Sequence, residues 1–205
     1  MAPTWKTNRS STHNMTDESS PSTQPVQLHL GCGKRFIPGF VHIDLAVFEH
    51  IDYTHRIDQL PMIETQSVDL IYACHAFEYF DRVEAVTVLQ EWGRVLKPGG
   101  ILRLAVPDFA SLIEVYQTYG ELGRVIGPLF GRWPIPGTTE TVYHKTVYDF
   151  HDLQTLLTTN GFEQVQRYDA RKTSHAQYDD YAQAYVPHMD QNGILVSLNV
   201  EAQKI

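Results

Sequence analysis

Hydrophobic and polar positions alternate in blocks along the chain from residue 26 onward, and each block has the length of a strand or a helix. The run VDLIYA at 68–73 is almost continuously apolar, which is typical of a strand buried in a parallel sheet. Apolar runs of strand length predict strands at 26–30, 41–45, 68–73, 101–106, 163–169 and 194–203.

Helical spacing of apolar residues follows the third of these strands. The segment 82–96 (RVEAVTVLQEWGRVL) predicts a helix, and we expect the following KPGG to end it. Further helices are expected at 109–119 and from 150 to a stop at Asn160-Gly161. This order of elements predicts an α/β domain with a Rossmann-like, mostly parallel sheet, an antiparallel closing strand and helices on both faces.

Two segments depart from the alternation. Residues 1–25 are rich in Ser, Thr, Asn and Pro and have few aliphatic side chains, so we expect a disordered tail followed by one domain over 26–205. Residues 120–145 combine many Gly and Pro residues with aromatic ones. That stretch is too apolar for a linker, and we interpret it as a flap packed over a functional site.

Composition excludes several classes of function. The 205 residues carry a net charge of −8 and no block of Lys and Arg, which argues against nucleic acid as a partner. No apolar stretch approaches the roughly 18 residues of a membrane span. The two cysteines cannot build a disulfide framework, so we expect reduced thiols and a cytoplasmic location. None of the ten histidines falls in a metal-ligand spacing, and we predict no metal.

The stretch LHLGCG at 28–33 raises the question of a cofactor loop. Gly31 and Gly33 would let the backbone approach a ligand closely after the first strand. Only seven residues, 34–40, separate them from the next strand, although parallel strands normally need a crossover of about a dozen. The stretch is therefore either an abbreviated cofactor loop or an ordinary glycine turn.

The later segments favour the cofactor loop. In order, the chain shows LHLGCG, VHIDL, RIDQLPM, VDLIYACHAFEYF and LKPGGILRLAVPDF. This series resembles the class I S-adenosylmethionine-dependent methyltransferases, and within them the type 11-like group, which has a short first βα unit. The resemblance covers 28–109 and continues loosely to 162. It implies S-adenosyl-L-methionine as the cofactor.

The resemblance also implies where the donor binds. Asp44 would accept hydrogen bonds from the ribose hydroxyls, although an exposed aspartate at a strand end is the alternative. Asp58 would lie near the adenine amino group, or it caps a helix or turn instead. The donor site implied by the resemblance consists of Leu30, Gly31, Cys32, Gly33, Asp44, Leu45, Asp58, Gln59, Leu60, Ala73, Cys74 and His75.

Three residues are candidates for catalysis. His75 follows the third strand and could take a proton from a hydroxyl acceptor, or it only packs against the donor. His144, within the proposed flap, is a second candidate for the base. Asp108 could orient the acceptor, but an N-cap for the helix at 109–119 is equally compatible. We expect Glu78 to anchor the following loop rather than take part in chemistry.

The chain departs from the family pattern at three positions: His29 stands where many members have an acid, Arg35 where a third glycine is expected, and Tyr79 where a second histidine is expected. The predicted function is methyl transfer to a small-molecule or glycan acceptor. Alternatives are a catalytically silent donor-binding partner and a nicotinamide-dependent oxidoreductase, the latter disfavoured by the short crossover. No feature of the sequence selects a protein acceptor.

Overall fold

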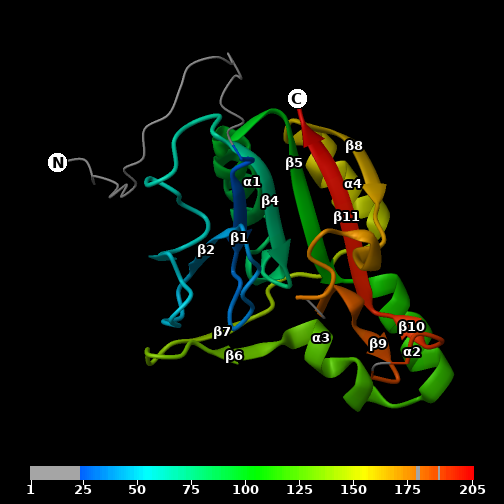
Figure 1. Cartoon of the computed structure of the whole chain (residues 1–205). Helices are drawn as coiled ribbons and strands as arrows, with labels where there is room; N and C mark the ends of the chain where they lie inside the picture. The colour runs from blue at the N-terminus through cyan, green and yellow to red at the C-terminus, as the bar shows by residue number, and fades with distance from the viewer. Residues whose placement is uncertain (1–23, 179–180, 189) are drawn as a thin grey trace, which may run out of the picture.

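The computed structural model describes residues 24–178, 181–188 and 190–205, so the expected tail lies outside it apart from its last two residues. A seven-stranded sheet with the order β3-β2-β1-β4-β5-β11-β8 forms the centre (Figure 1). Its strands are β1 (Gln27–Leu30), β2 (Val41–Asp44), β3 (Tyr53–Thr54), β4 (Val68–Cys74), β5 (Leu96–Pro107), β8 (Phe162–Arg167) and β11 (Ser197–Lys204). β11 pairs antiparallel with both of its neighbours, β5 and β8, and the other pairings in this sheet are parallel, which confirms the mostly parallel sheet with an antiparallel closing strand.

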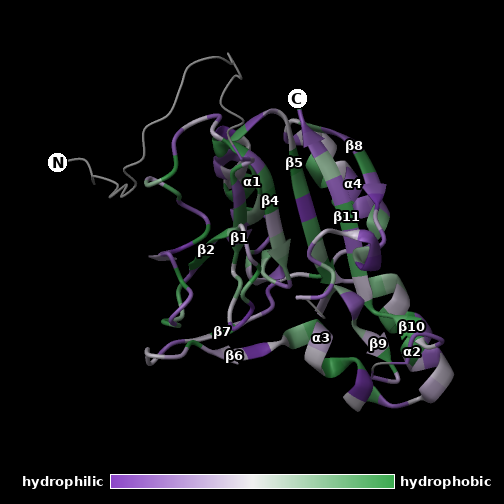
Figure 2. Ribbon diagram, viewed as in Figure 1, coloured by the Kyte–Doolittle hydropathy of each residue, from purple (hydrophilic) through white to green (hydrophobic). Residues whose placement is uncertain are grey.

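One face of the sheet is covered by α-helices. α1 (Glu84–Val95) and α4 (Phe150–Thr159) both lie behind the strands in Figure 1. Trp92 of α1 and Leu153 of α4 are fully buried in the same core cluster as the strand residues that point to this face. Figure 2 shows hydrophobic residues along β5 and hydrophilic ones in many of the loops.

The opposite face is covered by a loop and two short 3₁₀ helices instead of α-helices. Ile37 and Phe40 from the loop between β1 and β2 pack beside Tyr72, together with η3 (Ala170–Lys172) and η4 (Tyr181–Gln183). The seven-residue link is too short for a covering helix, because each residue adds only about 1.5 Å of helix. Its apolar side chains cover the sheet directly.

Two expected strands begin more than two residues away from the position that the sequence predicts. α1 ends at Val95, and KPGG belongs to the beginning of β5 rather than to a free turn. There Val68 pairs with Leu96 and Leu70 with Ile101, so the four residues bulge out of the ladder. The expected strand at 194–203 is divided: β10 (Ile194–Leu195) pairs with β9 (Tyr185–Val186) outside the main sheet, and β11 begins at 197.

The segment after β5 builds the lower part of the molecule in Figure 1. α2 (Phe109–Tyr119) ends at Gly120, whose φ of +66° is the left-handed conformation that stops a helix. The chain continues through η2 (Leu122–Arg124), α3 (Ile126–Phe130) and a hairpin of β6 (Arg132–Pro134) and β7 (Thr141–Tyr143). α3 and the hairpin lie below the carboxyl ends of the parallel strands.

Candidate active site

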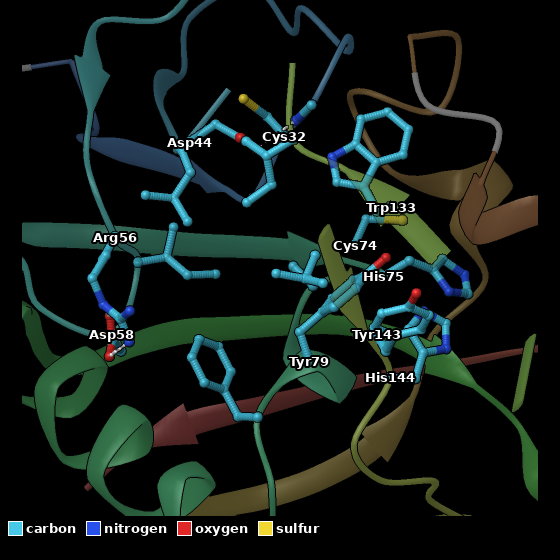
Figure 3. Close-up of a pocket in the computed structure, with 18 of the residues that line it drawn as sticks. Cys32, Asp44, Arg56, Asp58, Cys74, His75, Tyr79, Trp133, Tyr143 and His144 are labelled. Atoms are coloured by element: carbon cyan, nitrogen blue, oxygen red, sulfur yellow. Dashed lines mark hydrogen bonds and ion pairs between the residues drawn. The ribbon is translucent and has the colours of Figure 1, made fainter. Parts of the chain in front are cut away.

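A cavity of about 700 Å³ opens at the carboxyl ends of β1, β2 and β4. Ligands of open α/β sheets bind at this edge, and the volume is in the range of small-molecule sites. Figure 3 shows Asp44, Arg56 and Asp58 on one side of the cavity and Trp133, Tyr143 and His144 on the other. The residues singled out from the sequence that line it are Gly31, Cys32, Gly33, Asp44, Leu45, Asp58, Cys74, His75 and His144.

The glycine loop after β1 has the conformation that its sequence demands. Gly31 and Gly33 have φ values of +65° and +53°, which side chains disfavour. A Cβ on Gly31 would lie 2.5 Å from the Cβ of Ala76, whereas nothing lies within 4 Å of a Cβ on Gly33. Gly31 therefore permits close packing of two backbone segments, and Gly33 leaves open space beside the cavity.

Histidines hold this loop in the absence of a helix. The ring Nε2 of His42 accepts a hydrogen bond from the Ile37 amide at 3.0 Å, and His50 Nε2 donates to the Gly33 carbonyl at 3.1 Å. Burial lowers the pKa of His42, partly offset by Asp52. The ring thus remains neutral at neutral pH and keeps the lone pair that the Ile37 amide needs.

The Asp44 side chain, at the end of β2, holds the glycine loop that follows β1. Its Oδ2 accepts from the Gly33 amide at 2.8 Å and its Oδ1 from the Ala46 amide at 2.7 Å. Within the described part of the chain, no Lys or Arg pairs with this carboxylate. Each carboxylate oxygen can accept a second hydrogen bond, so Asp44 can still receive hydroxyl donors from a ligand in the cavity.

Asp58 is fixed by its neighbour. Arg56 Nε and Nη2 donate to its two oxygens at 2.9 and 2.6 Å, and both residues line the cavity. The next two residues leave the cavity: Gln59 faces a separate shallow depression, and Leu60 is fully buried with its amide on Glu91.

Leu30 and Ala73 are fully buried in the core on the helical side of the sheet and do not line the cavity. Cys32 and Cys74 do line it and are not joined to each other by a disulfide. Burial, reinforced by Asp44, raises the pKa of the Cys32 thiol far above its usual range. Cys32 is therefore a neutral lining residue and not a thiolate nucleophile.

His75 and His144 meet at a third residue, the fully buried Glu78. The Oε1 atom of Glu78 lies 3.3 Å from His75 Nδ1 and 3.6 Å from His144 Nε2. His75 has a φ of +50°, an uncommon conformation for a side chain of its size, and its amide donates to the Ala105 carbonyl at 2.7 Å. Strain of this kind concentrates at functional sites.

Asp108 lies outside the cavity, 3% exposed, at the N-cap of α2. Its Oδ1 accepts from the Ala110 amide and its Oδ2 from Arg167 Nη1, each at 3.2 Å. Asp108 thus occupies the N-cap position of α2, which is the alternative to a role in orienting the acceptor.

Sequence reasoning did not identify all of the aromatic side chains that line the half of the cavity opposite Asp44 and Asp58. Tyr79, Trp133, Tyr143 and Tyr181 line this half and come from three separate segments of the chain. The aromatic residues at 120–145 were a signal for part of it, and Tyr79 occupies the position where the family pattern has a second histidine. Tyr181 has no such signal in its local sequence. Burial, together with the charge of Glu78, raises the pKa of Tyr79, which stays protonated.

Two further findings concern ligands and surroundings. The described residues contain no group of three or more His, Cys, Asp or Glu side chains placed to hold a metal ion. Over the same ranges, none of the helices has both the length and the apolarity that crossing a membrane requires.

Comparisons with known proteins agree with the geometry of the site. Residues 42–104 match the family model described as "Methyltransferase domain". A SAM-dependent methyltransferase from Methanosarcina mazei is similar in structure, with a TM-score of 0.51, 18% identity, and coverage of 89% of this chain and 94% of that one. One from Archaeoglobus fulgidus gives a TM-score of 0.52 at 14% identity, covering 88% and 86%. A search of curated proteins found no match.

At such identities the structural likeness establishes the fold, and the family model matches the segment that carries Asp44, Asp58 and His75. The cofactor of the matching fold class is S-adenosyl-L-methionine, as the sequence predicts. The resemblance is thus confirmed at the level of the fold: residues 42–104 match the methyltransferase-domain model, and the chain has the fold of the class I S-adenosylmethionine-dependent methyltransferases.

Proposed function

We propose that this protein binds S-adenosyl-L-methionine in the cavity and transfers its methyl group to a small-molecule or glycan acceptor. The observation that carries the proposal is the joint placement of Gly31, Gly33 and Asp44 on one cavity wall, with the Gly33 amide donating to Asp44 at 2.8 Å. The bound donor would supply a methyl group on a positively charged sulfur.

The residues present fit this donor. The glycines leave space at the end of β1, and Asp44 has acceptor capacity for ribose hydroxyls without a competing cation in the described residues. Asp58 would face the adenine end, and its pairing with Arg56 holds it in place. His29, at the position where an acid is common, is buried and has a pKa well below 6.5, because of burial and the nearby His42, so it offers no negative charge.

The aromatic half of the cavity would bind the acceptor. Trp133 and Tyr143 of the β6–β7 hairpin present flat apolar faces that suit a sugar ring or an aromatic ring. This placement supports the interpretation of residues 120–145 as a flap over the acceptor site. Holding the acceptor atom in line with the methyl group would supply most of the acceleration.

A catalytically silent donor-binding protein is the second candidate, and one observation favours it. Both ring nitrogens of His144 already face protein atoms, Pro128 O at 2.8 Å and Glu78 Oε1 at 3.6 Å. Both nitrogens of His75 face Ser197 Oγ and Glu78 in the same way. A histidine base would have to release one of these contacts to meet an acceptor hydroxyl.

Titration calorimetry with S-adenosylmethionine and S-adenosylhomocysteine tests the donor, with NAD as a control ligand. We expect micromolar binding of both sulfur ligands that weakens about a hundredfold or more in Asp44→Ala, a loss that matches roughly two charge-assisted hydrogen bonds. Asp69→Asn is the matched control, because Asp69 lies outside the cavity and pairs with Lys97. Absence of binding to the folded protein would refute the proposal. Donor binding without methyl transfer across a panel of acceptors would favour the silent protein.

A further inference from the structure

The buried carboxylate of Glu78 has no conventional hydrogen-bond partner. Both of its oxygens are buried, and neither receives a hydrogen bond of normal geometry from the described residues. No Lys or Arg of these residues lies within ion-pair distance of Glu78; the ion-pair neighbours are the two imidazoles. An isolated buried carboxylate is costly, so something at this position must compensate it.

The tautomer of His144 follows from its other contact. His144 Nδ1 lies 2.8 Å from the Pro128 carbonyl, which can only accept, so Nδ1 carries a proton. In a neutral ring, Nε2 is then a lone pair, and this lone pair faces Glu78 Oε1 at 3.6 Å.

The tautomer of His75 follows from a chain of three bonds. The Asn199 amide nitrogen donates to the Ala182 carbonyl, so its Oδ1 accepts from the Ser197 hydroxyl at 3.0 Å. Since the Ser197 proton is used there, Ser197 Oγ accepts from His75 Nε2 at 3.2 Å. In a neutral ring, His75 Nδ1 is therefore also a lone pair, and it faces Glu78 Oε1 at 3.3 Å.

Two neutral imidazoles and one ionised carboxylate would thus place three electron pairs against one another in a buried space. We propose that Glu78, His75 and His144 jointly bind one proton, and that Glu78 is a positioning residue that fixes both imidazoles at the acceptor end of the cavity. The proton can lie on the carboxyl group, on His75 Nδ1 or on His144 Nε2. On a ring nitrogen the proton turns a contact between two electron pairs into an attraction between an imidazolium and a carboxylate, and on the carboxyl group it removes the buried charge.

The same cluster connects the flap to the sheet. Glu78 belongs to η1 (Phe77–Tyr79), and His144 follows β7. The Lys145 amide donates to the Glu78 carbonyl at 2.9 Å, and the Tyr79 ring packs edge-on against His144 at 4.8 Å. A Cβ on Gly131 would collide with the His144 ring, so the imidazole is enclosed on that side as well. Loss of the shared proton should loosen the hairpin.

The other titratable groups around the cluster do not supply the missing proton. Tyr79 is kept protonated by burial, and the buried Tyr148 hydroxyl likewise has its pKa raised by burial. Lys145 Nζ is bound to Glu84 at 2.8 Å on the exposed side. The rings of Tyr181 and His75 are arranged in a T shape, with 6.4 Å between their centroids.

Nuclear magnetic resonance of the wild-type protein tests the shared proton without any ligand. Long-range ¹H–¹⁵N spectra of the histidine rings and ¹³C spectra of the Glu78 carboxyl group at neutral pH report all three positions. We expect a proton on at least one of them. Glu78→Gln should leave both facing nitrogens unprotonated, because its amide can itself donate. Glu84→Gln removes the Lys145 ion pair, keeps an oxygen that can accept from the Asp81 amide, and does not touch the cluster, so it should resemble the wild type. A wild type with an ionised Glu78 and both facing nitrogens bare would overturn the proposal.

Hydrogen exchange tests the positioning. We expect amides in 131–144 to exchange about tenfold faster in Glu78→Leu, the loss of one charge-assisted hydrogen bond, and at an intermediate rate in Glu78→Gln. Unchanged exchange in Glu78→Leu would refute the positioning role. The role at the acceptor end rests on the proposed function, but the two can fail separately. A wild type that binds no donor would refute only the methyltransferase, because neither the resonance nor the exchange measurement uses the donor.

Discussion

Single residues decide how closely the cofactor loop packs. Gly31 and Gly33 share a left-handed backbone, yet their surroundings differ: one faces Ala76 and the other faces open space. Side chains in the left-handed region cost roughly 1–2 kcal/mol each. At Gly31 a side chain would in addition collide with Ala76, whereas at Gly33 it would meet nothing within 4 Å. The two glycines of one motif therefore have separate physical roles.

Replacing each glycine by alanine should separate these roles. We expect Gly33→Ala to lower the free energy of unfolding by roughly 1 kcal/mol, for the backbone alone. Gly31→Ala should lower it by a further 1–3 kcal/mol or so, because its Cβ overpacks against Ala76. Urea denaturation followed by circular dichroism measures both. Equal losses in the two variants would contradict the role assigned to Ala76.

At the scale of elements, the loop between β1 and β2 stands in place of a helix. Its apolar residues Ile37 and Phe40 cover the sheet, and its backbone is held by His42 and His50. A ring nitrogen of His42 accepts a buried amide hydrogen bond here that a helix would satisfy internally.

His42→Phe should therefore destabilise the loop. The variant keeps an aromatic ring but leaves the buried Ile37 amide without its acceptor, which costs roughly 1–3 kcal/mol. We expect a lower unfolding midpoint and weaker donor binding, because Gly33 lies in the same loop. His151→Phe, on the exposed surface of α4, is the control and should change neither. A stable His42→Phe protein with full donor affinity would show that the loop is held by other contacts.

The elements also show what could be predicted from the sequence. The apolar run VDLIYA and the helical spacing of apolar residues before KPGG are visible in the local sequence. The seven residues of the link at 34–40 are too few for a long helix, and the structure has none there. The bulge at KPGG and the division at Val196 depend on pairing with distant strands, which no local pattern records. The contact of Glu78 with His144 joins residues 66 positions apart in the chain and was equally hidden.

On the scale of the whole molecule, one sheet face is lined with histidines. His29 stacks on Tyr72 at 5.1 Å between ring centroids, and His175 contacts the same tyrosine at 4.4 Å. His175 Nε2 accepts from Arg103 at 2.8 Å, so this ring must be neutral. Burial and the Arg103 charge lower the pKa of His175 to about 4, and burial holds the pKa of His29 well below 6.5.

These imidazoles should make the protein sensitive to mild acid. A His whose pKa is lowered on folding takes up its proton in the unfolded chain first, so stability falls as pH drops from 6.5 towards 4 and is fully present above this window. His175 alone should remove about 2 kcal/mol between pH 7 and pH 5.

Urea denaturation at a series of pH values measures this loss. Carboxylates with a lowered pKa, such as Glu91 beside Arg94, contribute below about pH 4.5, so the two effects occupy different windows. In His175→Gln the amide oxygen can still accept from Arg103 but binds no proton, and the decline above pH 4.5 should flatten by about 2 kcal/mol. His151→Gln should keep the wild-type profile, since His151 is exposed. If both variants declined like the wild type, the acid sensitivity would not come from the buried histidine face.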